Sequence, residues 1–75
     1  YINLGKIYSA QGLFAESSQS FAMALSLGDD KYTKLLYGKS LLSQGDRIKA
    51  KEIFTELSNI DASDMEVKNI LNSLK

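Results

Sequence analysis

The residues that could do chemistry in this chain are few in kind, because its 75 residues include neither histidine nor cysteine. Histidine is the commonest metal ligand and a frequent general base, so its absence removes both roles at once. Serine, lysine, tyrosine and carboxylate side chains are present, but no nucleophile stands at a spacing that pairs it with a base. The sequence therefore predicts no enzyme activity, no metal site and no cofactor. Without cysteine it also gives no indication of the cellular compartment, so localisation stays unknown.

Two groups of charged residues resemble binding sites, but each has a simpler structural interpretation. Asp61, Asp64 and Glu66 resemble part of a calcium loop, but they lack the glycine and the alternating ligand spacing of an EF-hand. Helix capping explains them better. Arg47 and Lys51 share a helix face and could contact phosphate, although a solvated face is the better interpretation. The formal net charge of zero also argues against a nucleic-acid partner.

The elements that must position these side chains are predicted to be helices. Five segments fit, at residues 1–11, 14–27, 31–43, 47–59 and 64–75. Gly12, Gly28 and Gly45 follow three of them, and glycine suits a helix end because it adopts the left-handed conformation without a Cβ clash. No proline interrupts any segment. The predicted fold class is therefore all-α.

Acidic and hydroxyl residues mark the starts of the later segments. Asp29 and Asp30 can cap the third helix, and Asp46 the fourth, by accepting free backbone N–H groups. Ser63, followed three residues later by Glu66, predicts a capping box at the start of the last helix.

Apolar periodicity predicts which side chains are buried. The fourth and last segments have the apolar spacing of a single buried face. The third is apolar around most of its circumference, which indicates neighbours on several sides. The second is rich in small residues, among them Ser17, Ser18 and Ser20, which favours close helix packing with serine at partly exposed positions. The side chains expected to be mostly buried are Leu4, Tyr8, Phe21, Leu25, Tyr37, Leu41, Phe54, Leu57, Ile70 and Leu74.

A period of about 33 residues relates the first half of the chain to the second, as in stacked helical repeats. In such an architecture each unit exposes an apolar face that only its neighbour covers. The expected units are residues 1–30, 31–63 and 64–75, of which the last is a partial repeat or capping helix. The aligned pairs are Gly5 with Gly38, Lys6 with Lys39, Gly12 with Gly45, Ser17 with Ala50 and Phe21 with Phe54.

These residues resemble the tetratricopeptide repeat, whose pattern has a Leu-Gly pair, a tyrosine, a turn glycine, and small and aromatic positions along the second helix. The first unit matches through Leu4-Gly5, Tyr8 and Phe21. The second is diluted, with Lys34 where an aromatic is usual, and both units lack the proline that often ends a repeat. A related helical repeat of the Sel1 type is an alternative. The resemblance implies an α-solenoid of helical hairpins, with the two glycines permitting close helix crossings.

Tetratricopeptide arrays resemble a right-handed superhelix whose first helices line a concave groove, the usual binding surface of solenoids. The resemblance implies a protein–protein interaction scaffold that binds a peptide or partner helix there. Tyr32, Leu36 and Met65 are the expected apolar anchors, and Lys6 and Lys39 are expected to share an acidic group. The implied concave-face residues are Asn3, Lys6, Ala10, Tyr32, Leu36, Lys39, Ser43, Met65, Asn69 and Asn72. The carboxylate clamp of some family members is disfavoured, because only Lys6 and Asn69 match it.

Two other functions are open on this evidence: a structural spacer or self-assembly unit of a larger array, and an accessory domain of an enzyme outside this chain. Fewer than three full repeats bury little core, so the chain is expected to be a fragment of a longer array or to self-associate. Its apolar runs are far shorter than the roughly 20 residues that cross a bilayer, so direct membrane insertion is not expected.

Overall fold

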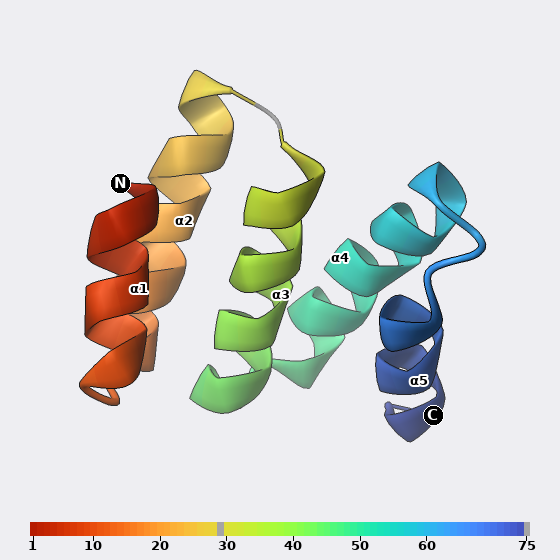
Figure 1. Cartoon of the computed structure of the whole chain (residues 1–75). Coiled ribbons are helices and arrows are strands. Elements are labelled where there is room, and N and C mark those ends of the chain that lie inside the picture. The colour runs from red at the N-terminus through yellow and green to blue at the C-terminus, as the bar shows by residue number, and fades with distance from the viewer. Residues whose placement is uncertain (29, 75) are drawn as a thin grey trace.

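The computed structural model describes residues 1–28 and 30–74, and these form an all-α structure without strands (Figure 1). The helices are α1 (Ile2–Ala10), α2 (Phe14–Leu27), α3 (Lys31–Gln44), α4 (Arg47–Ile60) and α5 (Met65–Ser73). The predicted all-helical class and the five predicted helices are therefore confirmed. The bounds of α2 are those predicted, and the other helices differ from prediction by one or two residues at an end.

Glycine and aspartate define several of the helix boundaries. Gly12 and Gly45 have φ angles of 79° and 99°, in the left-handed region. Gly28 ends α2 in an extended conformation instead, with a φ of −172°. Asp30 caps α3 and Asp46 caps α4, each by accepting a backbone N–H of the first helical turn. These two predicted caps are confirmed, whereas the cap predicted at Asp29 lies outside the described residues.

The start of α5 differs from the prediction. Asp64 is the N-cap, and its Oδ1 accepts the backbone N–H groups of Glu66 at 3.1 Å and Val67 at 3.3 Å. The capping box expected from Ser63 is therefore wrong. Ser63 instead donates its hydroxyl to the carboxylate of Asp61 at 2.6 Å. A carboxylate interacts favourably with the positive end of the helix dipole, which gives Asp64 the advantage over a neutral serine.

The helices pack in chain order, each against the next, with α3 between α2 and α4 (Figure 1). This central position explains why α3 is apolar around most of its circumference, as the sequence indicated. The buried apolar core comes from α2, α3, α4 and α5 and consists of Phe21, Tyr37, Leu41, Ala50, Phe54, Leu57 and Val67.

Two glycines allow successive helices to cross closely. A Cβ at Gly5 would lie 2.6 Å from Cε1 of Phe21, and a Cβ at Gly38 would lie 2.9 Å from Cζ of Phe54. Side chains in proteins do not tolerate such short distances, so α1 meets α2, and α3 meets α4, only because these positions lack a side chain. The predicted close crossing at both glycines is confirmed.

The serines of α2 are more deeply buried than predicted. Ser17, Ser18 and Ser20 are at most 6% exposed, so the expectation of partly exposed serines is wrong. The hydroxyl of Ser17 donates to the carbonyl oxygen of Gly5 at 2.8 Å, and its Oγ lies 2.9 Å from Oγ of Ser40. Hydrogen bonds to both neighbouring helices thus allow a polar side chain at the α2 interface.

One predicted core residue, on α1, is exposed in the structure. Leu4 is 40% exposed, although it was expected to be mostly buried. Because α1 packs mainly against α2, its other side stays uncovered, and Tyr1 and Ile7 are exposed there too. The remaining differences are smaller, with half-buried side chains at Tyr8, Leu25, Ile70 and Leu74.

Candidate functional site

A groove of about 330 Å³ lies between α1 and α3, and Phe21 of α2 contributes to its lining. On α3, the spacing of Leu36, Lys39 and Ser43 brings them to one helical face. Half of the predicted concave-face residues therefore meet in one place. They are Lys6 and Ala10 from α1 and Leu36, Lys39 and Ser43 from α3, joined by Ser9 and Ser40, which the sequence had not indicated.

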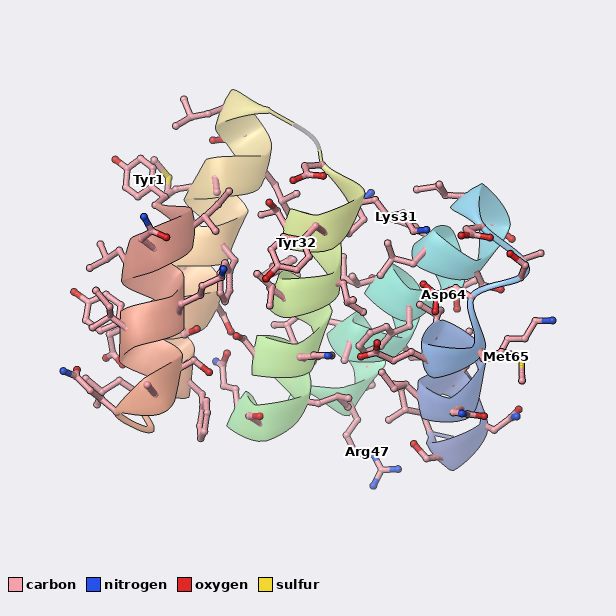
Figure 2. All side chains as sticks on the ribbon, in the orientation of Figure 1. Tyr1, Lys31, Tyr32, Arg47, Asp64 and Met65 are labelled. Carbon is pink, nitrogen blue, oxygen red and sulfur yellow. The ribbon has the colours of Figure 1, made fainter. Side chains whose placement is uncertain are left out.

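Lys6 interacts with an aromatic ring of the next predicted unit. Its Nζ lies 5.1 Å from the centroid of the Tyr32 ring, within the range of a cation–π interaction. Figure 2 shows Tyr32 projecting from the start of α3 toward α1. Both Lys6 and Tyr32 are exposed, so the ammonium group remains accessible to an acidic ligand.

Lys39 forms an ion pair with Glu66 of α5. Both side chains are about half exposed, 47% for Lys39 and 51% for Glu66, so the pair contributes little to stability by itself. The two groove lysines were expected to be free to share an anion, whereas one of them already has an intramolecular carboxylate. An acidic ligand would have to compete with Glu66 for Lys39.

The other five predicted concave-face residues, Tyr32 among them, do not line this groove. Asn3 lines a separate cavity at the ends of α1 and α2. Met65 is 64% exposed and points away from α3 (Figure 2). Asn69 and Asn72 follow it at helical spacing and therefore share its exposed face. The burial of Val67 turns the apolar face of α5 toward the core, which leaves Met65 on the outside.

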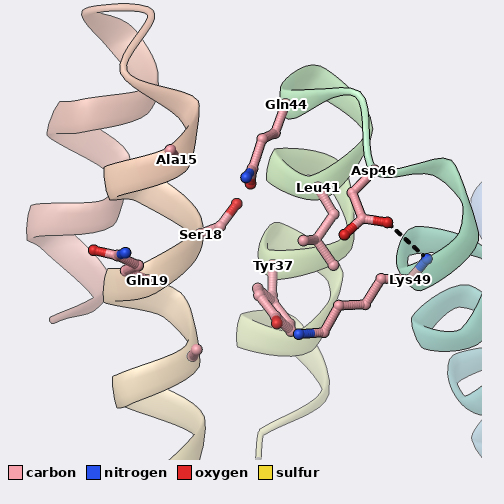
Figure 3. A pocket seen from close by; sticks show the side chains of 9 residues that line it. Ala15, Ser18, Gln19, Tyr37, Leu41, Gln44, Asp46 and Lys49 are labelled. Atoms are coloured by element: carbon pink, nitrogen blue, oxygen red, sulfur yellow. Dashed lines mark hydrogen bonds between the residues drawn. The ribbon is translucent and has the colours of Figure 1, made fainter.

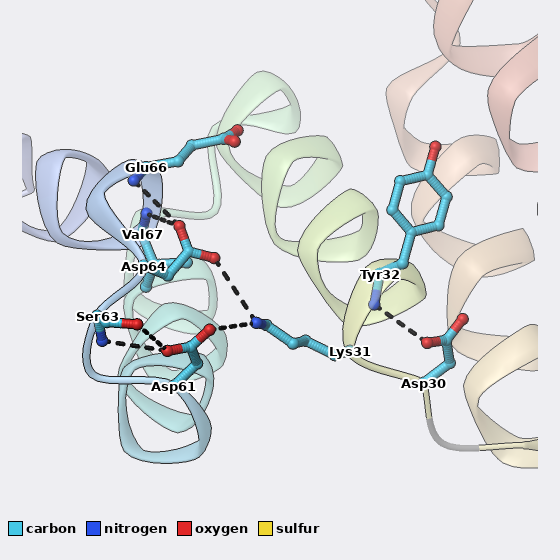
Figure 4. A network of polar contacts seen from close by, with 8 residues as sticks. All are labelled: Asp30, Lys31, Tyr32, Asp61, Ser63, Asp64, Glu66 and Val67. Carbon is cyan, nitrogen blue, oxygen red and sulfur yellow. Dashed lines mark hydrogen bonds and ion pairs between the residues drawn. The ribbon is translucent and has the colours of Figure 1, made fainter.

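A polar network joins the loop between α4 and α5 to the start of α3 (Figure 4). Nζ of Lys31 lies 2.7 Å from Oδ2 of Asp61 and 4.0 Å from Oδ2 of Asp64. The hydrogen bond from Lys31, together with hydrogen bonds from Ser63, lowers the pKa of Asp61 to about 2. The same bond to Asp61 raises the pKa of Lys31. Capping and ion pairing thus account for this acidic cluster, and no group of acidic side chains in the described ranges is placed to hold a metal ion.

Comparison with protein-family models, with curated proteins and with solved structures finds no match to this chain. Within the part of the chain that the structure describes, no helix is long and apolar enough to cross a bilayer. A function is therefore inferred from the groove and from the sequence pattern alone.

Proposed function

We propose that this chain is a helical-repeat module of the tetratricopeptide type that binds an acidic peptide in the groove between α1 and α3. One observation carries the proposal: Lys6 and Lys39, at equivalent positions of the two predicted units, both line the groove. Leu36 and Phe21 supply apolar contact surface beside them. Two cations next to apolar side chains fit a peptide that carries an acidic group close to an apolar anchor.

Equivalent contacts in the two halves of the chain support the repeat interpretation. Gly5 meets Phe21 in the first half, as Gly38 meets Phe54 in the second. The helices also follow one another in space in the order of the chain, as a solenoid of stacked hairpins requires. The proposed unit boundaries near residues 30 and 63 fall between helices.

Peptide selection followed by charge reversal tests the proposed binding. Peptides are selected from a display library on the wild-type protein, and the tightest binder is measured by calorimetry. The double variant Lys6→Glu with Lys39→Glu should weaken its binding by about 1–3 kcal/mol, because charge-assisted hydrogen bonds are lost. Added salt should weaken wild-type binding more than binding by this variant.

The matched control is the double variant Lys51→Glu with Lys68→Glu, which changes the net charge equally at exposed positions outside the groove. It should bind the peptide about as tightly as the wild type, and both variants should retain wild-type helicity by circular dichroism. If the groove variant and the control bind the selected peptide equally, peptide binding in the groove is disproved.

Self-assembly is a second candidate function, favoured by the exposed apolar side chains of α1. Leu4 is 40% exposed and Ile7 is 53% exposed. Their equivalents in the second predicted unit, Tyr37 and Ser40, are buried in α3, which packs against α2. A helix from a second copy could cover α1 as α2 covers α3, and this would bury the exposed apolar surface.

A further inference from the structure

A second cavity, of about 260 Å³, lies between α2, the C-terminal half of α3 and the start of α4 (Figure 3). On α3 it is lined by Tyr37, Leu41 and Gln44, which lie on a different helical face from the groove residues. The cavity is therefore separate from the proposed peptide groove. Its polar lining side chains are Ser18, Gln19, Tyr37, Gln44, Asp46 and Lys49.

Among the side chains that line this cavity, Ser18 has a buried hydroxyl without a hydrogen-bond partner among the described residues. The residue is 6% exposed. The adjacent Ser17 has two partners, so tight packing of α2 does not in itself leave serines unpaired. A buried hydroxyl without a partner costs free energy. In Figure 3 the Ser18 hydroxyl is directed across the cavity toward the carboxamide of Gln44.

The charges on the cavity wall favour a neutral ligand. Asp46 and Lys49 lie together at the start of α4, where Oδ1 of Asp46 accepts the backbone N–H of Lys49 at 3.1 Å. The Lys49 ammonium lies 6.0 Å from the centroid of the Tyr37 ring. The Asp46 carboxylate and the Lys49 ammonium give the cavity wall one charge of each sign, so the attraction of an ion to one of them is opposed by repulsion from the other. A neutral group that both donates and accepts hydrogen bonds can pair with such a wall without the desolvation cost of an ion.

We propose that this cavity binds a neutral carboxamide, with the Ser18 hydroxyl as its buried anchor and the Gln44 side chain as its second hydrogen-bond partner. A carboxamide presents donors and an acceptor in one plane, so it can pair with a hydroxyl and with another amide at once. Asn and Gln side chains carry this group, and so does every peptide bond. The competing arrangement is that Gln44 itself turns onto Ser18 and fills the site.

A series of small probes of similar shape but different charge tests the site in the wild-type protein. The ¹⁵N-labelled protein is titrated with acetamide, acetate or acetamidinium and followed by nuclear magnetic resonance. Acetamide should shift the backbone amide signals of Ser18, Leu41 and Gln44 saturably, with about fivefold higher affinity than either ion. N-methylacetamide then distinguishes the two sources: tighter binding than acetamide indicates a peptide bond, and weaker binding indicates an Asn or Gln side chain.

Ser18→Ala removes the proposed anchor and should weaken acetamide binding about fivefold. Ser26→Ala is the matched control on the same helix, because Ser26 donates its hydroxyl to the Met23 carbonyl at 2.7 Å and does not line the cavity. It should keep wild-type affinity. Because Ser18 lacks a partner, its replacement should not lower Tm, and a lower Tm would mean that Gln44 already pairs with it. That result would overturn the proposal, as would equal binding of the charged probes or unchanged acetamide affinity in Ser18→Ala.

Discussion

At the scale of single residues, the absence of a side chain at Gly38 allows α3 and α4 to pack. A Cβ there would lie 2.9 Å from Cζ of Phe54 and 3.2 Å from Cγ2 of Ile53. Phe54 is fully buried, so its ring has no free volume to move into. Gly38→Ala should lower the free energy of unfolding by about 1–3 kcal/mol. This effect should exceed the advantage of about 1 kcal/mol that alanine has over glycine in a helix. Urea unfolding followed by circular dichroism measures the difference.

Gly28→Ala is the matched control for this substitution. No heavy atom lies within 4 Å of the position its Cβ would take, and its φ of −172° is extended backbone that any residue adopts. The free energy of unfolding should change by no more than about 0.5 kcal/mol. Equal stability of the Gly38→Ala and Gly28→Ala proteins would mean that the contact with Phe54 does not limit the packing of α3 on α4.

At the scale of elements, α5 packs on α4 through its apolar face, and the pair of Lys31 with Asp61 ties the loop before α5 to the start of α3. The pKa of Asp61 falls from 3.8 to about 2 on folding, so its stabilising effect is fully present above the unfolded pKa and is lost as the pH falls through the folded value. The wild type should therefore lose more stability than Asp61→Asn between about pH 4 and pH 2. Thermal unfolding of both proteins from pH 5 downward, at about half-unit steps, measures this difference.

Lys31→Met provides an independent check, because it removes the other half of the same pair. The Tm difference between wild type and Lys31→Met should shrink over the same acidic range as the Asp61 carboxylate is protonated. Curves of Tm against pH that run parallel for all three proteins would show that the pair does not contribute to the attachment of α5.

At the scale of the whole molecule, dimensions of 28 × 25 × 17 Å leave little interior, and apolar side chains remain exposed on α1. If this surface joins two copies, sedimentation of the wild type should depend on protein concentration. Ile7→Glu should raise the dimer dissociation constant by at least about tenfold, or ~1.4 kcal/mol. Ile48→Glu changes the same residue type at an exposed position on α4 and should leave association unchanged. A monomeric wild type at all concentrations, or an equal effect of both variants, would refute this interface.

The sequence by itself determined the helices and their closest crossings. Glycine turns at Gly12 and Gly45 and the caps at Asp30 and Asp46 act within a few residues, so they could be recognised from local spacing. The contacts of Gly5 and Gly38 were also predictable, because the same pattern recurs in both halves. Apolar periodicity identified most of the core, since a helix of known period presents a known face.

Only the tertiary structure decided which side of α5 faces α3 and which edges of the molecule stay uncovered. Glu66 rather than Met65 faces α3, because burial of Val67 sets the rotation of α5 about its axis. Leu4 fits the apolar pattern of the core but is exposed, since no second neighbour covers α1. The pairing of Lys39 with Glu66 could not be predicted either, because it depends on the rotation of α5. Periodicity identifies the faces of one helix, whereas the partners of each face depend on packing between residues distant along the chain.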